Sequence, residues 1–344
     1  MDTTQFVRIR DSLLEKRQAL SDWFSSARED EKRLRLGPAV ENQFAAHLQV
    51  LDTAVEGAQA GTLGLCSVCH DTINDGLLEM DYTCCVCLDH LSEQEMRHLE
   101  HDLELSASTQ RTLLAPSAPE VPGVEYAVFS RPAQYIGGDY FDFLQYTDGA
   151  FGMAIADVAG HGIQASLQMA SLQTALRTLV PDSISPAAVV ERINHIYNHN
   201  INFSSFVTLF LGRIDPAAGV LTYCNAGHNP PILLHNGHNG SQAPVVDWLK
   251  PTGAAIGLVE GSPFYAGTIP LHPGDLLLLY TDGVTEARDP AGEFFGEDRL
   301  VELLAAHHRL PARELVHVLR THLESFRAGQ PLADDTTVLV CKLQ

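Results

Sequence analysis

The feature that most constrains the fold is a succession of short apolar runs that begins after Val124. The runs are YAVFS, GMAIADV, SFVTLFLGRI, VLTYCNA, PPILLH, DLLLLYTDG and TTVLVCKL. Gly, Asn and Asp separate them, and this pattern predicts β-strands. Helical patterns lie at residues 163–179, 186–198, 296–308 and 312–326. Because strands are grouped between helices instead of alternating with them, we predict an α+β fold of antiparallel sheets flanked by helices.

Composition limits the classes of function. The chain has 344 residues, of which 45% are hydrophobic, enough for one large domain and a smaller one. Its formal net charge of -21 disfavours direct binding to nucleic acid or anionic lipid and favours cations or basic surfaces as partners. The sequence has neither a signal-peptide pattern nor an apolar run of membrane-spanning length, so we expect a cytoplasmic protein.

The first third of the chain has a different texture. Helical spacing of apolar residues runs through residues 1–60, interrupted at Gly37 and Pro38, and predicts a helical hairpin. A cysteine-rich segment follows, and then a helical pattern from Leu88 to Leu114 that stops before Pro116. The predicted domains are a hairpin at 1–60, a cysteine module at 61–90, a linker helix at 91–116 and a large domain at 117–344.

Aspartates stand at the ends of four strand-like runs. They are Asp139, Asp157, Asp282 and the pair Asp334 and Asp335. Clustered carboxylates repel one another unless a hard dication neutralises them, so their convergence predicts a magnesium or manganese site. Each aspartate also has an ordinary interpretation: Asp282 before Gly283 forms a turn, and Asp157 lies near a helix start. Their joint arrangement favours the metal site.

At these residues the sequence from Gln110 onward resembles the bacterial SpoIIE and RsbU type of metal-dependent protein phosphatases, relatives of protein phosphatase 2C. The matching pieces include YIGGDYFDF, IADVAGHGIQASLQMA, TYCNAGHNPPILL, HPGDLLLLYTDGVTEARDPAGEFFGEDRL and ADDTTVLV. The resemblance implies an αββα sandwich with a two-metal centre at one edge of the sheets. It assigns as metal ligands Asp139, Asp157, Asp282, Asp334, the neighbouring Asp335 and the backbone carbonyl of Val158. We interpret Asp142 either as a residue that supports the metal ligands or as structural.

The implied reaction is hydrolysis of phosphoserine or phosphothreonine by a water molecule that two Mn²⁺ or Mg²⁺ ions activate. The usual substrates in the resembling family are phosphorylated STAS-domain proteins that antagonise anti-sigma factors. One departure concerns the histidine that eukaryotic relatives use as a general acid, because Ala159 stands at that position. We interpret His161 as shaping a turn and His228 as structural. Arg131 either contacts substrate phosphate or is a surface residue.

The cysteines form a second motif. Cys66 and Cys69, and then Cys84 and Cys87, are two CxxC pairs separated by 14 residues, which predicts one tetrahedral zinc site. Disulfides are the alternative, and a cytosolic setting disfavours them.

The cysteine segment resembles the zinc ribbon of DksA and TraR proteins, and the helical hairpin resembles the coiled coil of their longer members. That family acts on RNA polymerase through a coiled-coil tip with a DxxDxA pattern, which AREDEKRLRLGP lacks here. The alternative function is therefore a DksA-like polymerase regulator with an inert phosphatase domain. Our first hypothesis is a phosphatase controlled by its N-terminal module, with the linker helix pairing in a homodimer.

Overall fold

The computed structural model describes residues 13, 14, 17, 18, 21, 25, 40–73, 84–114, 120–160, 162–199, 206–236 and 244–344. The chain divides into two compact units, Met1–Asp102 and Leu103–Gln344. Within the described residues, every helix is too short or too polar to cross a membrane. The second unit begins at Leu103, inside the helix that the sequence predicts as a linker.

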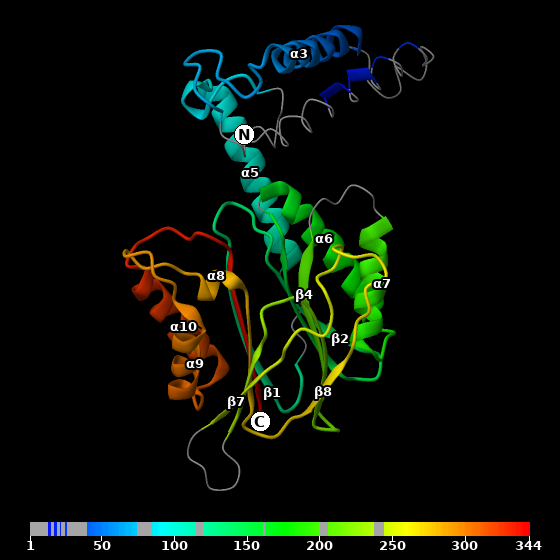
Figure 1. Cartoon of the computed structure of the whole chain (residues 1–344), viewed down its shortest axis with the longest axis vertical. Coiled ribbons are helices and arrows are strands. Elements are labelled where there is room, and N and C mark those ends of the chain that lie inside the picture. Colours follow the sequence, from blue (N-terminus) through cyan, green and yellow to red (C-terminus); the bar gives the residue numbers. More distant parts are fainter. Residues whose placement is uncertain are drawn as a thin grey trace. The chain divides into compact units, whose positions relative to one another are not determined.

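Two five-stranded antiparallel sheets form the second unit (Figure 1). The first sheet has the order β1 (Val124–Arg131), β10 (Thr336–Leu343), β9 (Leu276–Tyr280), β6 (Ile232–His235) and β7 (Val245–Trp248). The second has the order β2 (Tyr140–Gln145), β3 (Phe151–Val158), β4 (Val207–Asp215), β5 (Val220–Ala226) and β8 (Gly267–Pro270). In both sheets the central strands are the apolar runs of the sequence.

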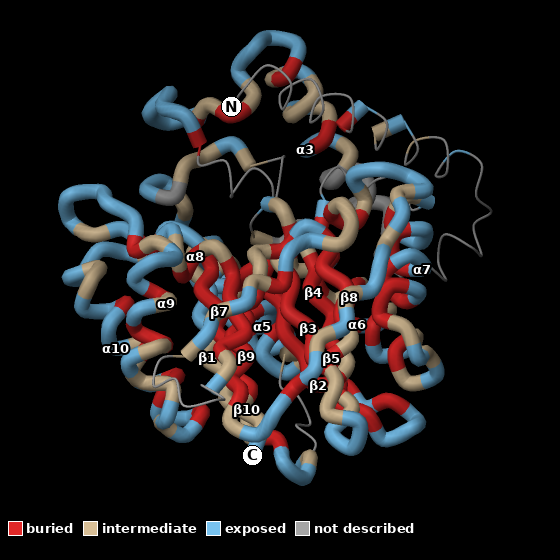
Figure 2. The backbone as a smooth tube through the Cα atoms, turned by 60° about the horizontal axis from the view of Figure 1, so that its bottom comes forward, coloured by how far each residue is buried: buried red, intermediate tan, exposed pale blue. Residues whose placement is uncertain are grey.

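Successive side chains along each strand point to opposite faces of the sheet, so the hydrophobic core has three layers: one between the two sheets and one between each sheet and its helices. In β3, Phe151, Met153 and Ile155 face the other sheet, whereas Ala154 and Ala156 face helices. This period of two is expected where both faces of a strand are buried. Figure 2 shows that the buried positions run along the strands of both sheets. Odd-numbered positions of β3 therefore point into the space between the sheets, and this includes Asp157 near the end of the strand.

Helices cover the outer face of each sheet. The second sheet is covered by α6 (Gly162–Leu179) and α7 (Pro186–His199), and the first by α9 (Gly296–His307) and α10 (Ala312–Arg327). A single turn, α8 (Asp282–Thr285), follows β9 directly. The predicted αββα sandwich is confirmed, with the carboxylate-bearing ends of β3 and β9 in different sheets.

The helix α5 (Glu93–Leu114) begins in the first unit and ends in the second. Its start is fixed by a capping box: the Ser92 N–H donates to Glu95 Oε2 at 2.8 Å, and the Glu95 N–H donates to Ser92 Oγ at 3.3 Å. The short 3₁₀ helix η1 (Leu88–His90) precedes it. The chain therefore runs from the cysteine segment into the second unit through one uninterrupted helix.

The first unit contains α3 (Val40–Ala60), in which Leu51 is fully buried. Arg17 donates to Asp52 Oδ1 at 2.7 Å, so the early helical segment contacts α3. Most of the first predicted helix and the whole segment AREDEKRLRLGP lie outside the described residues. The hairpin therefore stays a prediction.

Candidate active site

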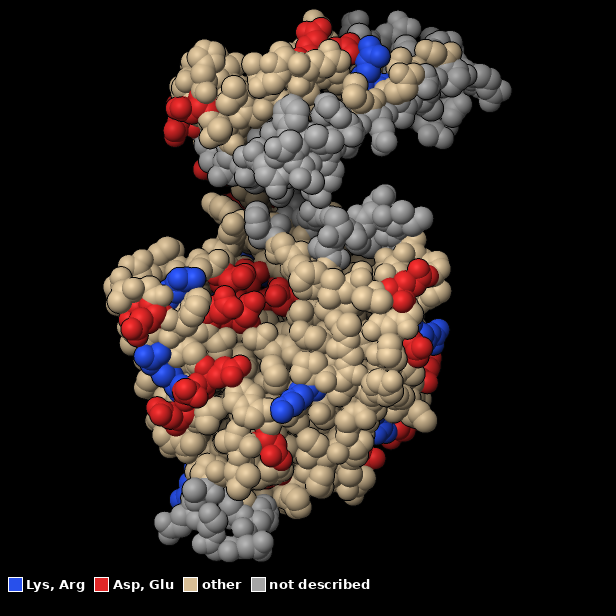
Figure 3. Space-filling model, viewed as in Figure 1, with Lys and Arg blue, Asp and Glu red and all other residues tan. Residues whose placement is uncertain are grey.

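The predicted carboxylates come from both sheets and gather at one end of the sandwich. Asp157 lies near the end of β3 and Asp139 just before β2, while Asp282 follows β9 and Asp334 lies just before β10. Neighbouring strands thus deliver them in pairs, because β2 pairs with β3 and β9 pairs with β10. Figure 3 shows acidic side chains gathered on one face of this unit.

Asp139 is the most firmly held member of the set. It is buried, and its Oδ2 accepts hydrogen bonds from Thr281 Oγ1 at 2.8 Å and from Thr337 Oγ1 at 2.7 Å. Thr337 belongs to β10 and Thr281 directly follows β9, so the two threonines join the first sheet to the loop that precedes the second sheet. Hydroxyl donors on a buried carboxylate favour its charged form and fix its orientation.

Asp335 supports the loop that carries Asp139. Its Oδ1 accepts the Ala133 N–H at 2.7 Å, and its Oδ2 accepts the Gly138 N–H at 2.6 Å. A Cβ atom at Gly137 would lie 2.2 Å from Asp335 Oδ2, so this close approach requires glycine. Both carboxylate oxygens are therefore engaged by backbone amides, which makes Asp335 a positioning residue for Asp139.

Burial and mutual repulsion raise the pKa values of these carboxyl groups. Burial, and then the charges of Asp282, Asp334 and Asp335, raise the pKa of Asp157 to about 7. Burial and the charge of Asp157 raise the pKa of Asp139 well above its ordinary value. Among the described residues, no three of these carboxylates bring oxygen atoms within 4.8 Å of one another. The cluster is thus an open group of oxygen donors whose repulsion a bound cation would relieve.

The donor set fits hard dications. Asp139, Asp157, Asp282 and Asp334 offer carboxylate oxygens, and Val158 offers its carbonyl oxygen beside Gly138. A Cβ atom at Gly138 would lie 2.9 Å from that carbonyl oxygen, so the glycine permits the close approach. Mg²⁺ and Mn²⁺ prefer oxygen ligands of this kind.

Three other residues named from the sequence have distinct places. Asp142 is buried on the α6 side of β2, where Arg177 Nε donates to its Oδ2 at 2.7 Å and Tyr140 Oη donates at 2.8 Å. His228 is also buried, and burial lowers its pKa to about 4, which suits a neutral structural imidazole. His161 lies outside the described residues.

Gln110, on α5, is a residue that the sequence analysis did not assign to the site. Its Nε2 donates to the Gly137 carbonyl oxygen at 2.6 Å, and its Oε1 accepts the Gly137 N–H at 3.1 Å. Gly137 lies two residues before Asp139. The same end of the helix accepts a hydrogen bond from Gln173 on α6 through the Leu113 carbonyl. The last turns of α5 thus hold the loop of Asp139 and contact the helix that follows β3.

The cysteine segment gathers a second donor set in the first unit. Cys66, Cys69, Cys87 and His90 place one ligand atom each within 4.8 Å of one another. Cys69 Sγ lies 3.8 Å from Cys87 Sγ, and Cys66 Sγ lies 3.8 Å from His90 Nδ1. Ligands about 2.3 Å from a tetrahedral zinc lie about 3.8 Å apart, so these distances suit zinc.

This set differs from the predicted ligand set by one residue. His90 stands where the sequence prediction had Cys84, whose Sγ instead lies 3.2 Å from the Val86 carbonyl oxygen. The turn of η1 brings His90 back to Cys87, with its Nδ1 at 3.1 Å from the Cys87 sulfur. The sequence signal was present, because Cys87 and His90 repeat the two-residue spacing of Cys66 and Cys69.

Comparison with known protein families shows to which family the chain belongs. Residues 147–344, more than half of the chain, match the family described as Stage II sporulation protein E (SpoIIE). The chain belongs to the SpoIIE family. Three of the site aspartates, Asp157, Asp282 and Asp334, lie within the matched region, and Asp139 lies just before it.

Similar proteins support the assignment of this chain to the SpoIIE family. It is 29% identical over 246 residues to phosphoserine phosphatase RsbU of Bacillus subtilis (strain 168), covering 72% of this chain and 71% of that protein. The structure of the RsbU and RsbW domains of Rv1364c from Mycobacterium tuberculosis matches with a TM-score of 0.53 at 28% identity, over 66% of this chain and 62% of that one. The chain is thus a protein serine/threonine phosphatase.

The fold has a further solved counterpart. The SiaA-PP2C domain of Pseudomonas aeruginosa matches with a TM-score of 0.61 and 21% identity, over 72% of this chain and 98% of that one. At this identity the likeness concerns the fold alone. It supports the description of the second unit as a PP2C-like sandwich.

Proposed function

We propose that this SpoIIE-family phosphatase depends on two Mn²⁺ or Mg²⁺ ions and acts on a phosphorylated STAS-domain protein in sigma-factor regulation. The observation that carries the metal dependence is the convergence of Asp139, Asp157, Asp282 and Asp334 at one end of the sandwich. The relative named phosphoserine phosphatase supports phosphoserine as the group hydrolysed. The STAS-domain substrate rests on the family resemblance of the sequence.

Some residues of the site would bind the metal ions, and others orient the side chains that bind them. Asp139, Asp157, Asp282 and Asp334 would hold the ions, together with the carbonyl of Val158. When bound, such ions supply Lewis acidity that activates water and neutralises the phosphoryl oxygens. Thr281 and Thr337 keep Asp139 oriented, with hydroxyl donors at 2.8 and 2.7 Å. Ala159 offers no proton, so protonation of the leaving group requires another donor.

The substrate proposal is tested with two forms of one phosphoserine site. The full chain with Mn²⁺ is given a phosphorylated STAS-domain protein and a peptide of the same local sequence. We expect kcat/KM to be more than tenfold higher on the folded protein, a factor that about 1.4 kcal/mol of added contact supplies. Equal values on the two substrates would refute recognition of the folded domain. Binding to RNA polymerase without any turnover would instead favour the DksA-like alternative.

We also propose that the first unit controls this activity through α5. The helix begins three residues after His90, and its Gln110 is hydrogen-bonded to Gly137 in the loop of Asp139. A change in the helix therefore has a direct route to a metal-binding carboxylate. Leu105 on the same helix is 59% exposed, and we propose that this face pairs in a homodimer. Sedimentation that shows a monomer at assay concentration would refute the pairing.

We further propose that Cys66, Cys69, Cys87 and His90 bind one structural zinc ion. Cobalt substitution tests the ligand set, because thiolate and imidazole ligands give different absorption spectra. Tetrahedral cobalt with three sulfur ligands and one nitrogen ligand is expected in the full chain. His90→Ala should change this spectrum and lower the zinc content, whereas Cys84→Ser should leave both unchanged. A four-sulfur spectrum that Cys84→Ser alters would restore the original prediction.

A further inference from the structure

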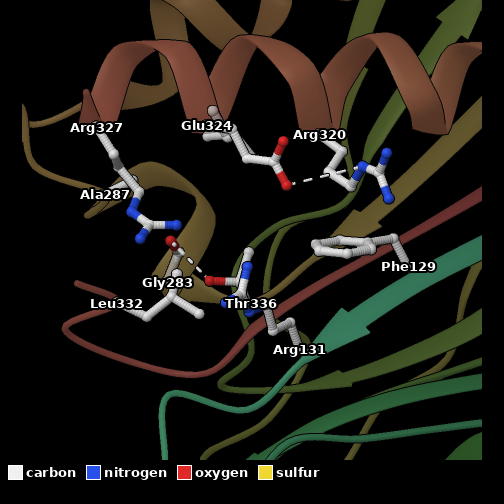
Figure 4. Close-up of a pocket in the computed structure, with 10 residues that line it drawn as sticks. Phe129, Arg131, Gly283, Ala287, Arg320, Glu324, Arg327, Leu332 and Thr336 are labelled. Carbon is white, nitrogen blue, oxygen red and sulfur yellow. Dashed lines mark hydrogen bonds and ion pairs between the residues drawn. The ribbon is translucent and has the colours of Figure 1, made fainter. Parts of the chain in front are cut away.

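A small pocket lies between α10 and the strands β1 and β10 of the first sheet. Figure 4 shows its side chains. Phe129 and Arg131 come from β1, Arg320 and Arg327 from α10, and Gly283 and Thr336 form part of the wall. The mechanism described above uses none of these side chains.

The pocket adjoins the carboxylate cluster through its backbone. Gly283 follows Asp282 directly, and Thr336 follows Asp335. Thr336 Oγ1 lies 3.4 Å from the Gly283 carbonyl oxygen, and a Cβ atom at Gly283 would lie only 2.0 Å from the Asp335 carbonyl oxygen. The wall of the pocket is thus built from the two segments that carry Asp282 and Asp334. A group bound in the pocket would be a close neighbour of a phosphoryl group at the cluster.

Positive charge in the pocket exceeds negative charge. Arg320 Nε is buried without a hydrogen-bond partner, but Glu324 Oε1 lies 3.8 Å away, and the Arg320 guanidinium lies 6.0 Å from the centre of the Phe129 ring, so a neighbouring carboxylate offsets its charge. Arg131 and Arg327 are different. Within the described parts of the chain, no carboxylate lies within 4.0 Å of either guanidinium group.

Arg327 has a buried donor without an acceptor and, among the described residues, no carboxylate beside it. One of its terminal nitrogens donates to the Gln330 carbonyl, but its Nε is buried without a hydrogen-bond partner. Burial, and then the positive charge of Arg131, lower the pKa of Arg327. A buried donor without an acceptor is costly, and a planar guanidinium matches a carboxylate with two parallel hydrogen bonds.

We propose that this pocket is an anion subsite in which Arg327 and Arg131 bind an acidic side chain of the substrate, next to the phosphoserine. The inference rests on the proposed phosphatase function. A protein of net charge -21 repels acidic substrates over most of its surface. A local cationic pocket beside the reaction centre offsets that repulsion and selects phosphoserines with acidic neighbours.

The test compares two phosphoserine peptides, one with Asp and Glu around the phosphoserine and one with Ala at those positions. The readout is the ratio of their kcat/KM values with the full chain and Mn²⁺. We expect the wild-type ratio to favour the acidic peptide by about tenfold and Arg327→Gln to bring it close to one. Arg327→Lys, which keeps the charge but loses the planar fork, should give an intermediate ratio. Arg313→Gln, an exposed residue on the same helix, should keep the wild-type ratio.

The outcomes separate this inference from the function on which it rests. A wild-type ratio near one, or the same ratio in Arg327→Gln as in the wild type, would overturn the subsite while phosphatase activity stands. A ratio is independent of the fraction of folded enzyme, so partial misfolding of a variant does not obscure it. Failure of the wild-type chain to hydrolyse an aryl phosphate with Mn²⁺ would overturn the proposed function and the subsite together.

Discussion

Asp157→Asn is expected to abolish phosphate release from an aryl phosphate and from a phosphoserine peptide, by a factor on the order of 10³ or more. Asparagine keeps the shape of the side chain but removes the negative charge that would bind a dication. Burial and three other aspartates act on this carboxyl group, so it lies at the centre of the repelling cluster. Phosphate release in the presence of Mn²⁺ measures the effect.

Thermal unfolding distinguishes this loss from misfolding. Because Asp157 is one of several carboxylates that repel one another, Asp157→Asn is expected not to lower the melting temperature of the metal-free protein. Mn²⁺ should raise the melting temperature of the wild type and much less that of the variant. Asp298→Asn, at an exposed position on α9, is the matched control and should retain activity. Turnover in Asp157→Asn above a tenth of the wild-type value would contradict the assignment.

The second large effect is expected at Gln110. In Gln110→Ala, the buried N–H and carbonyl of Gly137 both lose their partner, at a cost of about 1–3 kcal/mol each. The loop that carries Asp139 should then lose its fixed position. We expect kcat/KM to fall by about tenfold to a hundredfold.

A positioning role makes a specific claim about metal affinity. If Gln110 acts through Asp139, the Mn²⁺ concentration for half-maximal activity should rise in Gln110→Ala, and saturating Mn²⁺ should restore part of the activity. Ser108→Ala, on the exposed side of the same helix, should change neither quantity. A lower kcat with unchanged Mn²⁺ dependence would show that Gln110 does not position the metal-binding loop.

The sequence predicted the central strands of the sandwich and the edge strand β1, but not the other edge strands, β2, β7 and β8. Long apolar runs such as the one in β4 were recognised, because a strand buried on both faces has a continuous apolar pattern. The strand β2 was missed, since Asp142 interrupts its apolar run and is buried only through Arg177 and Tyr140. The strands β7 and β8 have four residues each and alternate between half-buried and exposed positions, which leaves little apolar signal.

The site was predictable where chemistry and spacing coincide. Aspartates at the ends of strand-like runs indicated Asp139, Asp157 and Asp282, and glycines adjoin Asp139 and Asp282. Gln110 gave no such signal, because its contact with Gly137 spans 27 residues and depends on how α5 packs. The two CxxC pairs indicated Cys84 as the fourth member of the cysteine cluster, whereas the folded chain brings His90, three residues after Cys87, next to the other three residues.

Metal dependence is the central claim, and one titration tests it most directly. The full chain is stripped of divalent ions with a chelator, Mn²⁺ is added back stepwise, and phosphate release from an aryl phosphate is followed together with Mn²⁺ bound per chain. We expect negligible turnover without Mn²⁺ and activity that rises as two ions bind, with neither response in Asp157→Asn. Turnover that persists in excess chelator would contradict the account.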